Sequence, residues 1–413
     1  MDFGLEFEYY PKISPRFLTE AQEIIEKNRE KWQKPFFIDT KSYINLEEIR
    51  NISKDFIKDN IKNVIVLGTG GSIQTLIAIK HIATKNIIAI TSSRAMELKT
   101  CLETTNPQDS VVIPISRGGE TLDINSTIGI FLKRGYPFIG LSSKGEMYQI
   151  LKDAKVPILS VPDLPGRFAG SISNVGIVPA FIAGIDIKDF LYGLEEGYKS
   201  FINSKESLAH QFAVFIYSLY KLGYKIVFSM PYSVNLEGSI GLFVQEVSES
   251  TGKNEKGLMG AFQSAPLCQH SVLEFLLGGT KGSVIPILWN VNNELRDVIL
   301  PSSLEYIDGQ SAHTIVDYQA DATFQALIEQ KVPTAKITIE NVKADSIGNL
   351  IAFIQSTVYL LCLLLDVNWA DNPKVIIGKK ICNEALINKI SSENRKQNRI
   401  KIAENAFKDF LSQ

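Results

Sequence analysis

Short apolar runs that alternate with segments of helical periodicity constrain the fold of this chain more than any other feature of its sequence. The first run, NVIVLG (63–68), ends in glycine and is followed by the helical pattern SIQTLIAIKHI. Runs of the same kind recur at 86–90, 111–115, 137–143, 156–162, 224–230, 283–290 and 335–340. Apolar, β-rich runs of this length between helices indicate a parallel sheet with helices on both faces.

The alternation occurs in two blocks. A polar segment, EEGYKSFINSKES, separates them near residue 200, and 413 residues are enough for more than one domain. We therefore predict two doubly wound α/β domains, each a three-layer αβα sandwich around a parallel sheet. The expected boundaries are a helical N-terminal extension at 1–45, a first domain at 46–200, a second domain at 201–382 and a C-terminal helical tail at 383–413.

Charge and cysteine content argue against several classes of protein. The net charge of −2 gives no strong field for nucleic acid or an anionic membrane. The four cysteines are widely spaced without a C-x-x-C pair, which argues against a zinc site and a disulfide framework. The N-terminus MDFGLEFEYY is not typical of a signal peptide, because it has early acidic residues and no apolar core after basic ones. We expect a cytoplasmic protein.

One apolar segment, 347–367, is nearly long enough to span a bilayer. Asn349, Gln355 and Ser356 interrupt it, and a membrane span tolerates such polar groups poorly. The pattern therefore favours a buried helix in a large core.

Two glycine-rich loops follow predicted strands. The first, GTGGSI, opens a helix, and free N–H groups at such a turn favour an anion. It matches a dinucleotide fingerprint poorly, because Ile73 stands where the third glycine would be. No Gly-Lys-Ser/Thr follows, so it is not a P-loop either. A simple tight turn remains the alternative.

The second loop, SRGGET (116–121), has the same placement between strand and helix. Ser116 and Thr121 supply hydroxyl groups, Arg117 supplies positive charge, and Gly118 allows close backbone approach. Ligands of open parallel sheets bind at the carboxyl ends of the strands, where both loops are expected. Together they indicate a pocket for a phosphate monoester with a sugar-sized space beside it, unless they are two unrelated turns.

SRGGET is similar to the S-x-S-G-x-T loop of sugar isomerase (SIS) domains, with Gly118 in place of the middle serine. Two such domains in one chain, with the motifs below, resemble the glucose-6-phosphate isomerase family from about residue 60 to 385. The resemblance implies two SIS domains and a sugar phosphate substrate.

The segment SESTGK is similar to the family's E-S-N-G-K motif, whose glutamate is the general base; the match falls on Glu249. Gln245 shares its helical face and matches a glutamine that contacts the substrate, whereas Glu246 lies on a different side. PGRFA is similar to the family's G-G-R-[FY]-S segment, so Arg167 would face the enediolate. Taken alone, Glu249 would be a solvated helical residue and Arg167 a surface cation.

Two further motifs complete the resemblance. CQH is similar to the family's G-Q-H and places His270 on the motif histidine, with Cys268 replacing the glycine. DNPKVIIGKK is similar to D-Q-P-G-V-E-x-G-K and places Lys379 on the motif lysine. The positions that differ from this last motif are Asn372, Lys374 and Ile376.

The resemblance implies reversible isomerisation of glucose 6-phosphate and fructose 6-phosphate, through ring opening and a cis-enediol, without a metal or other cofactor. His270, aided by Lys379, would open the ring, Glu249 would move a proton between C2 and C1, and Arg167 would stabilise the oxyanion. The residues expected to bind substrate are Gly71, Ser72, Ser116, Arg117, Gly118, Thr121 and Gln245.

The resemblance further implies a homodimer in which each chain supplies His270 to the other chain's site. Two alternatives stay open from the sequence. One is a bifunctional enzyme that also isomerises mannose 6-phosphate, and the other is a non-catalytic sugar-phosphate-binding SIS protein.

Overall fold

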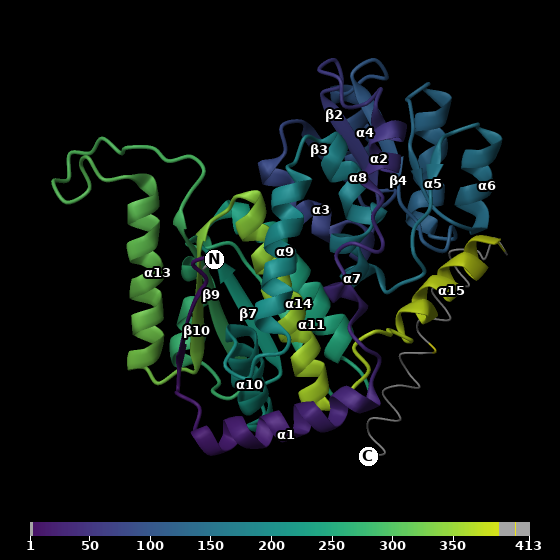
Figure 1. The fold of residues 1–413 in the computed structure, drawn as a ribbon. Coiled ribbons are helices and arrows are strands. Elements are labelled where there is room, and N and C mark those ends of the chain that lie inside the picture. The colour runs from purple at the N-terminus through teal and green to yellow at the C-terminus, as the bar shows by residue number, and fades with distance from the viewer. Residues whose placement is uncertain (1–2, 388–400, 402–413) are drawn as a thin grey trace. The chain divides into compact units, whose positions relative to one another are not determined.

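The structure is a computed structural model that describes residues 3–387 and 401. The chain divides into two compact units, Met1–Asp371 and Asn372–Gln413. Both sheets lie in the larger unit (Figure 1). In the smaller unit the structure describes one helix, α15 (Val375–Ile387), and most of the predicted C-terminal tail (383–413) lies outside the described residues.

The first sheet has the predicted parallel strands. Their spatial order begins β3-β2-β4, and isolated bridges from Val112 and Ile115 extend it to β5, which pairs with β6. The strands are β2 (Asn63–Leu67), β3 (Asn86–Ile90), β4 (Ser110–Pro114), β5 (Gly140–Leu141) and β6 (Ile158–Leu159). All of them coincide with or lie within a residue of the apolar runs seen in the sequence.

Strand β2 shows why these runs are apolar throughout. Val64 and Val66 belong to one buried cluster, and Ile65 and Leu67 belong to another. The first cluster is shared with α2 (Leu46–Ser53), α3 (Gln74–Ile79) and α8 (Asn174–Ile182). The second is shared with α4 (Ala95–Thr104), α5 (Leu122–Lys133) and α6 (Gly145–Asp153). A sheet with helices on both faces buries every side chain of its central strand.

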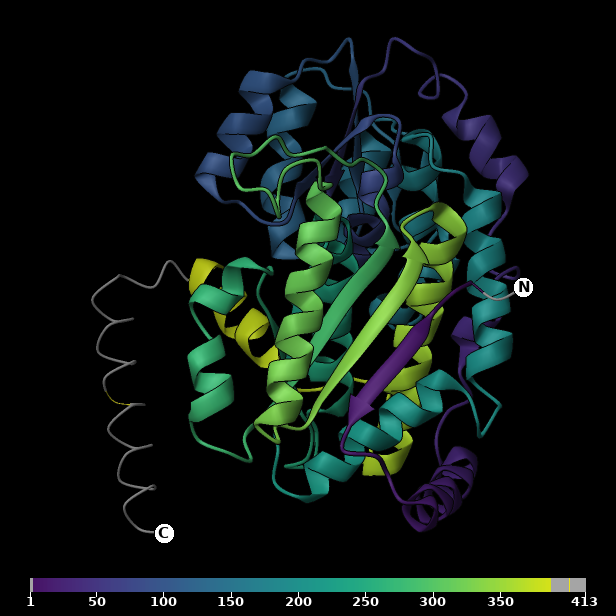
Figure 2. The same ribbon diagram turned by 90° about the vertical axis from the view of Figure 1, so that its left-hand side faces the viewer.

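The second sheet has the order β1-β10-β9-β7-β8, and Figure 2 shows β1, β10 and β9 side by side. Its strands are β1 (Glu6–Tyr10), β7 (Ile226–Pro231), β8 (Met259–Phe262), β9 (Val284–Asn293) and β10 (Thr334–Asn341). Helices α10 (Leu208–Lys221), α11 (Glu237–Thr251) and α14 (Ala344–Leu365) share the large buried cluster with one face. Helices α12 (Leu273–Gly278) and α13 (Ala312–Glu329) pack on the other, which completes the predicted three layers.

The N-terminal extension was expected to be helical, and it contains a strand as well. β1 pairs antiparallel with β10, while the expected helix is α1 (Pro15–Lys31). The buried amide of Asn28 donates to the Leu363 carbonyl on α14 at 2.8 Å. This segment therefore packs on the second half of the chain. β8 was also missing from the sequence prediction, because its four residues carry too little pattern to identify.

The apolar segment predicted as a buried helix is α14. By length and composition it could cross a membrane, and its apolar window is 100% buried within the structure. Gln355, one of its polar residues, is fully buried and accepts hydrogen bonds from Ser171 and Tyr198. Gln355 thus finds its hydrogen-bond partners in the protein interior.

Helix α9 (Ile187–Phe201) crosses α14 at backbone contact. A Cβ on Gly193 would lie 2.6 Å from the carbonyl carbon of Asp345, and one on Gly348 would lie 2.9 Å from the Leu194 nitrogen. The predicted boundary near residue 200 falls at the end of α9 and stays a prediction, because helices from the two halves share one buried cluster here.

We expect Gly193→Ala to lower the free energy of unfolding by about 1–3 kcal/mol, because the added methyl must push α9 and α14 apart. Gly129→Ala is the matched control, since Gly129 is exposed in α5 and a Cβ there meets nothing within 4 Å. The control should be stabilised by about 0.5–1 kcal/mol. Urea unfolding of both variants measures the difference, and equal stabilities would contradict the close crossing.

Candidate functional site

The two glycine-rich loops lie at one edge of the first sheet, as predicted. The turn Gly70–Ser72 joins β2 to α3, and SRGGET joins β4 to α5. Because β2 and β4 are adjacent parallel strands, their carboxyl ends bring the two loops to the same edge. This is the edge where a ligand of such a sheet binds.

The SRGGET loop is shaped from within by its first hydroxyl group. Ser116 is 2% exposed, and its Oγ accepts from the Gly119 N–H at 3.0 Å and lies 3.0 Å from Thr121 Oγ1. Gly119 has φ +70°, and a Cβ there would lie 2.8 Å from Gly145 Cα. Gly118 is exposed, and a Cβ there would meet nothing within 4 Å. The loop is therefore held on its inner side and open at Gly118.

Arg117 connects this loop to the segment that leads to Arg167. Its Nη1 donates to the Leu164 carbonyl, and its Nε lies 3.7 Å from an Asp163 carboxylate oxygen. Lys144 Nζ lies 2.9 Å from the same carboxylate. A hydrogen bond and charge from Lys144, with the charge of Arg117, lower the pKa of Asp163. The carboxylate at this edge is thus already paired with cations.

Gly71 brings the first loop into backbone contact with Arg167. A Cβ on Gly71 would lie 2.6 Å from both the Arg167 Cα and the Gly166 carbonyl carbon. Gly166 and Arg167 begin the short helix α7 (Gly166–Ala169). Only a glycine at position 71 allows this approach, so the backbone of the first glycine-rich loop directly contacts the backbone of Arg167.

Arg167, Glu249 and Gln245 form one cluster. Arg167 is 3% exposed, and its Nη1 lies 3.5 Å from Glu249 Oε2. Gln245 Nε2 donates to Glu249 Oε1 at 3.1 Å, as the shared helical face predicts. Burial lowers the pKa of Arg167 from its ordinary value. The carboxylate of Glu249 is thus oriented from two sides.

Other contacts of Arg167 come from residues that the sequence analysis did not assign. Its Nε donates to Ser250 Oγ at 2.9 Å, and its Nη2 donates to the carbonyls of Trp369 at 2.5 Å and Asp371 at 3.1 Å. These distances leave the buried guanidinium well satisfied. Ser250 lies in the quoted SESTGK motif, but main-chain acceptors 200 residues away leave no signal in the sequence.

Lys253, the lysine of SESTGK, contacts the segment 368–371, which also supplies carbonyl acceptors to Arg167. Its Nζ donates to the Ser250 carbonyl at 2.8 Å and to the Asn368 carbonyl, and it lies 3.3 Å from Asp371 Oδ1. Burial lowers the pKa of Lys253. The motif lysine therefore supports the backbone that binds Arg167.

The structure does not bring His270 into this cluster. His270 is an exposed residue at the end of a 3-10 turn, Leu267–His270, in which Cys268 is buried, and among the described residues no hydrogen bond or ion pair joins it to Glu249 or Arg167. Its neighbour Gln269 anchors the turn by donating to Thr323 Oγ1 at 2.6 Å. Lys379 lies on α15 in the smaller unit. The roles of both residues stay predictions.

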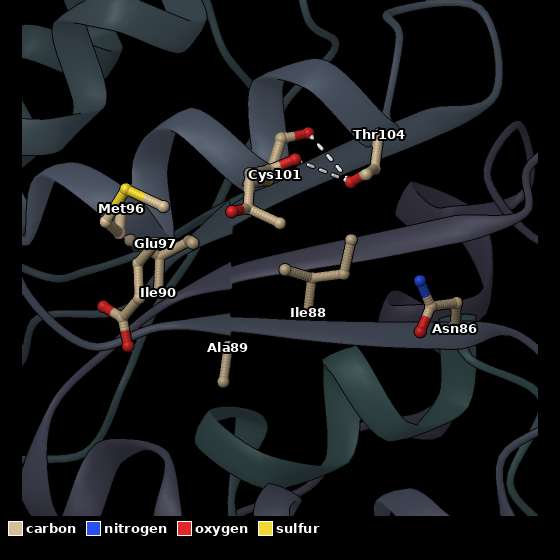
Figure 3. A pocket seen from close by; sticks show the side chains of 9 residues that line it. Asn86, Ile88, Ala89, Ile90, Met96, Glu97, Cys101 and Thr104 are labelled. Carbon is tan, nitrogen blue, oxygen red and sulfur yellow. Dashed lines mark hydrogen bonds between the residues drawn. The ribbon is translucent and has the colours of Figure 1, made fainter.

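The arrangement of metal-ligating side chains and the position of a cavity bear on where a metal ion or a small molecule could bind in the described residues. No group of three or more His, Cys, Asp or Glu side chains among residues 3–387 and 401 is arranged to hold a metal ion. A cavity of about 480 Å³ lies between β3 and α4 (Figure 3), and Ile88, Met96 and Cys101 contribute to its walls. None of the predicted site residues lines this mostly apolar cavity, so it is distinct from the cluster around Arg167.

Curated proteins named glucose-6-phosphate isomerase are similar to this chain over most of its length, although no family model matches it. A probable glucose-6-phosphate isomerase of Haloquadratum walsbyi is 24% identical over 405 residues, which cover 92% of this chain and 94% of the relative. A glucose-6-phosphate isomerase of Methanocaldococcus jannaschii is 26% identical over 351 residues, which cover 80% and 86%. The resemblance indicated by the motifs is confirmed.

Solved structures confirm the fold. A glucose-6-phosphate isomerase from Chlamydia trachomatis superposes with a TM-score of 0.79 at 18% identity, covering 98% of this chain and 92% of that one. A tagatose-6-phosphate ketose/aldose isomerase from Escherichia coli gives a TM-score of 0.51 at 13% identity, covering 86% and 96%. The predicted α/β fold with SIS-type parallel sheets is therefore correct.

We expect Gly71→Ala to lower the free energy of unfolding by about 1–3 kcal/mol, because its methyl group would overlap the backbone of Gly166 and Arg167. Gly118→Ala is the matched control, since that position is open and its φ lies outside the left-handed region. The control should change stability by less than about 0.5 kcal/mol. Chemical unfolding measures both, and a stable Gly71→Ala variant would refute the backbone contact between the loops.

Proposed function

We propose that this chain is a glucose-6-phosphate isomerase, which interconverts D-glucose 6-phosphate and D-fructose 6-phosphate in glycolysis and gluconeogenesis. One observation carries the proposal above the others: Glu249, on the motif position of the family's base, is held between Gln245 and Arg167 beside two anion-binding loops. The similarity of the whole chain to proteins of that name supports it.

In this proposal the two glycine-rich loops bind the phosphate group of the substrate. The exposed backbone at Gly118 and the turn Gly70–Ser72 offer N–H groups, and Arg117, Ser72 and Thr121 add charge and hydroxyl groups. Binding energy from a phosphate group remote from the reacting carbons orients the sugar for reaction. In this proposal Ser116 acts through the shape of the loop, because its hydroxyl is engaged inside it.

Glu249 is the group placed to move the proton. As general base it takes the proton from C2 of the ring-opened aldose, the C–H electrons form the C1–C2 double bond of the cis-enediol, and O1 carries the charge. The hydroxyl proton on O2 moves to O1, and Glu249 then returns its proton to C1 while the electrons on O2 form the C2 carbonyl, which gives the ketose. Arg167 stabilises the oxygen charge that develops between these steps. Arg167 is only 3% exposed, so water screens its guanidinium charge little, and the attraction between this charge and the oxyanion is stronger than it would be at the surface.

Ring opening is assigned to His270 with Lys379, in a cytoplasmic homodimer whose partner chain supplies His270. The exposed position of His270 agrees with a role at a neighbouring chain, since a histidine at the surface is accessible to a second copy. Histidine titrates near neutrality and suits proton transfer to the ring oxygen.

We expect Glu249→Gln to reduce isomerisation by about 10²–10⁴-fold, because it removes the base and retains the size of the side chain. The measurement is a coupled assay of fructose 6-phosphate conversion to glucose 6-phosphate, run beside mannose 6-phosphate. Binding of the sugar phosphate should persist in the variant. Full activity in Glu249→Gln would reject the assignment of the base, and a wild type that binds but turns over neither sugar would indicate a non-catalytic binding protein.

The assignment of His270 to the partner's site predicts complementation. Glu249→Gln and His270→Ala homodimers should each be nearly inactive, whereas a mixture unfolded and refolded together should recover about a quarter of wild-type activity, because half of the dimers are mixed and each has one intact site. Mixing without refolding is the control. No recovery in refolded mixed dimers would place His270 in the same chain's site.

A further inference from the structure

Helix α11 carries a second glutamate one turn before Glu249, and it is completely buried. Glu246 is 0% exposed; it takes no part in the Gln245–Glu249 hydrogen bond, but three residues before Glu249 on the helix it is close enough for the two charges to interact. A carboxyl group is almost never buried in this way unless it is paired. The mechanism above does not use it.

Gln355 on α14 is the hydrogen-bond partner of Glu246. Its Nε2 donates to Glu246 Oε1 at 2.8 Å and lies 3.3 Å from the main-chain carbonyl oxygen of Arg167, which also accepts from it. Its Oε1 accepts from Tyr198 on α9 and from Ser171 Oγ at 3.3 Å. One buried amide therefore joins Glu246 to the backbone of the arginine that faces Glu249.

The guanidinium of Arg167 donates no described hydrogen bond to Glu246, although its charge acts on that carboxyl group. Its donors go to Ser250, to the carbonyls of Trp369 and Asp371, and towards Glu249. Glu246 Oε2 has no hydrogen-bond partner among the described residues. A buried carboxylate without a hydrogen-bonded cation costs several kcal/mol, so this environment favours the protonated acid. Desolvation accordingly raises the pKa of Glu246 to about 8.

We propose that Glu246 is a positioning residue: kept neutral by its burial and hydrogen-bonded to Gln355, it supports the Arg167 backbone and leaves the guanidinium charge to Glu249 and the substrate. This inference rests on the proposed function. Were Glu246 to ionise, a second buried anion would draw Arg167 away from Glu249, and activity would fall.

The ionisable groups that act on Glu246 come from α7, α9, α11 and α14. Arg167 of α7 favours its charged form, and Glu249 of α11 opposes it. Tyr198 of α9 and Cys362 of α14 also interact with its charge, and burial raises the pKa of both. Helix α3 and strands β7 and β8, which pack against α11, contribute no ionisable side chain.

The pH profile of isomerisation in Glu246→Gln and Glu246→Leu tests the proposal. The amide is a neutral isostere, so Glu246→Gln should keep kcat at pH 7 within about threefold of wild type, whereas Glu246→Leu, which cannot accept from Gln355, should lose at least about tenfold. Wild type should lose activity as the pH rises through about 8, and this limb should be absent from Glu246→Gln. A loss in Glu246→Gln as large as in Glu246→Leu, or an unchanged alkaline limb, would overturn the proposal.

Thermal unfolding gives a second measurement that does not depend on activity. The folded-state pKa of about 8 lies above the unfolded value of 4.5, so stability from the protonated form is complete below pH 4.5 and is lost as the pH rises towards 8. The Tm of wild type should therefore fall relative to that of Glu246→Gln between pH 5 and pH 8. A constant difference would show that Glu246 is ionised throughout, which contradicts the proposal.

The two measurements separate this proposal from the proposed function. A wild type that isomerises neither glucose 6-phosphate nor mannose 6-phosphate would refute the function, and with it the positioning role. The unfolding series would still decide the protonation state of Glu246. An active wild type whose pH profile is unaffected by Glu246→Gln would refute the positioning role alone.

Discussion

The buried guanidinium of Arg167 is the interaction on which the site and much of the interior depend. A charge that is 3% exposed can exist inside the protein only because acceptors surround it. Those acceptors come from α11 and from the 369–371 segment at the end of the larger unit, while the arginine itself belongs to the first half of the chain. Folding of the two halves around one another therefore creates the site, and neither half contains it alone.

Backbone contacts at glycines give this arrangement its precision. Gly71 brings the first loop against Arg167, and Gly193 and Gly348 bring α9 against α14. Side chains at these positions would separate elements by more than the tolerance of a hydrogen bond. The proposed proton transfer needs Glu249 and Arg167 within such tolerances, so the close approaches at these glycines would matter for the reaction as well as for stability.

Local patterns predicted most of the fold, because each strand of a doubly wound sheet is apolar throughout and each helix has its own period. The runs at 63–68 and 86–90 correspond closely to β2 and β3. The pairing of Gln245 with Glu249 could be predicted for the same reason, since helical spacing alone places them together. Strand β1 could not, because its partner lies more than 320 residues away in sequence.

The sequence also could not predict which residues surround a buried polar side chain. The spacing of Glu246 places it near Glu249 on the helix, but nothing local indicates whether solvent or Gln355 meets its carboxyl group. His270 and Lys379 were found only through motif resemblance. His270 ends a 3-10 turn without a described bond to the cluster, and Lys379 lies on a helix of the smaller unit.

The pairing of β1 with β10 has a consequence for the order in which the protein matures. During synthesis the first strand leaves the ribosome long before residues 334–338, its partners, are made. All strands of the first sheet lie within residues 63–159, so they can pair with one another before the second sheet is translated. The N-terminal segment must wait, unpaired, until nearly the whole chain has emerged, so the beginning of the sequence is among the last parts to be built into the native protein.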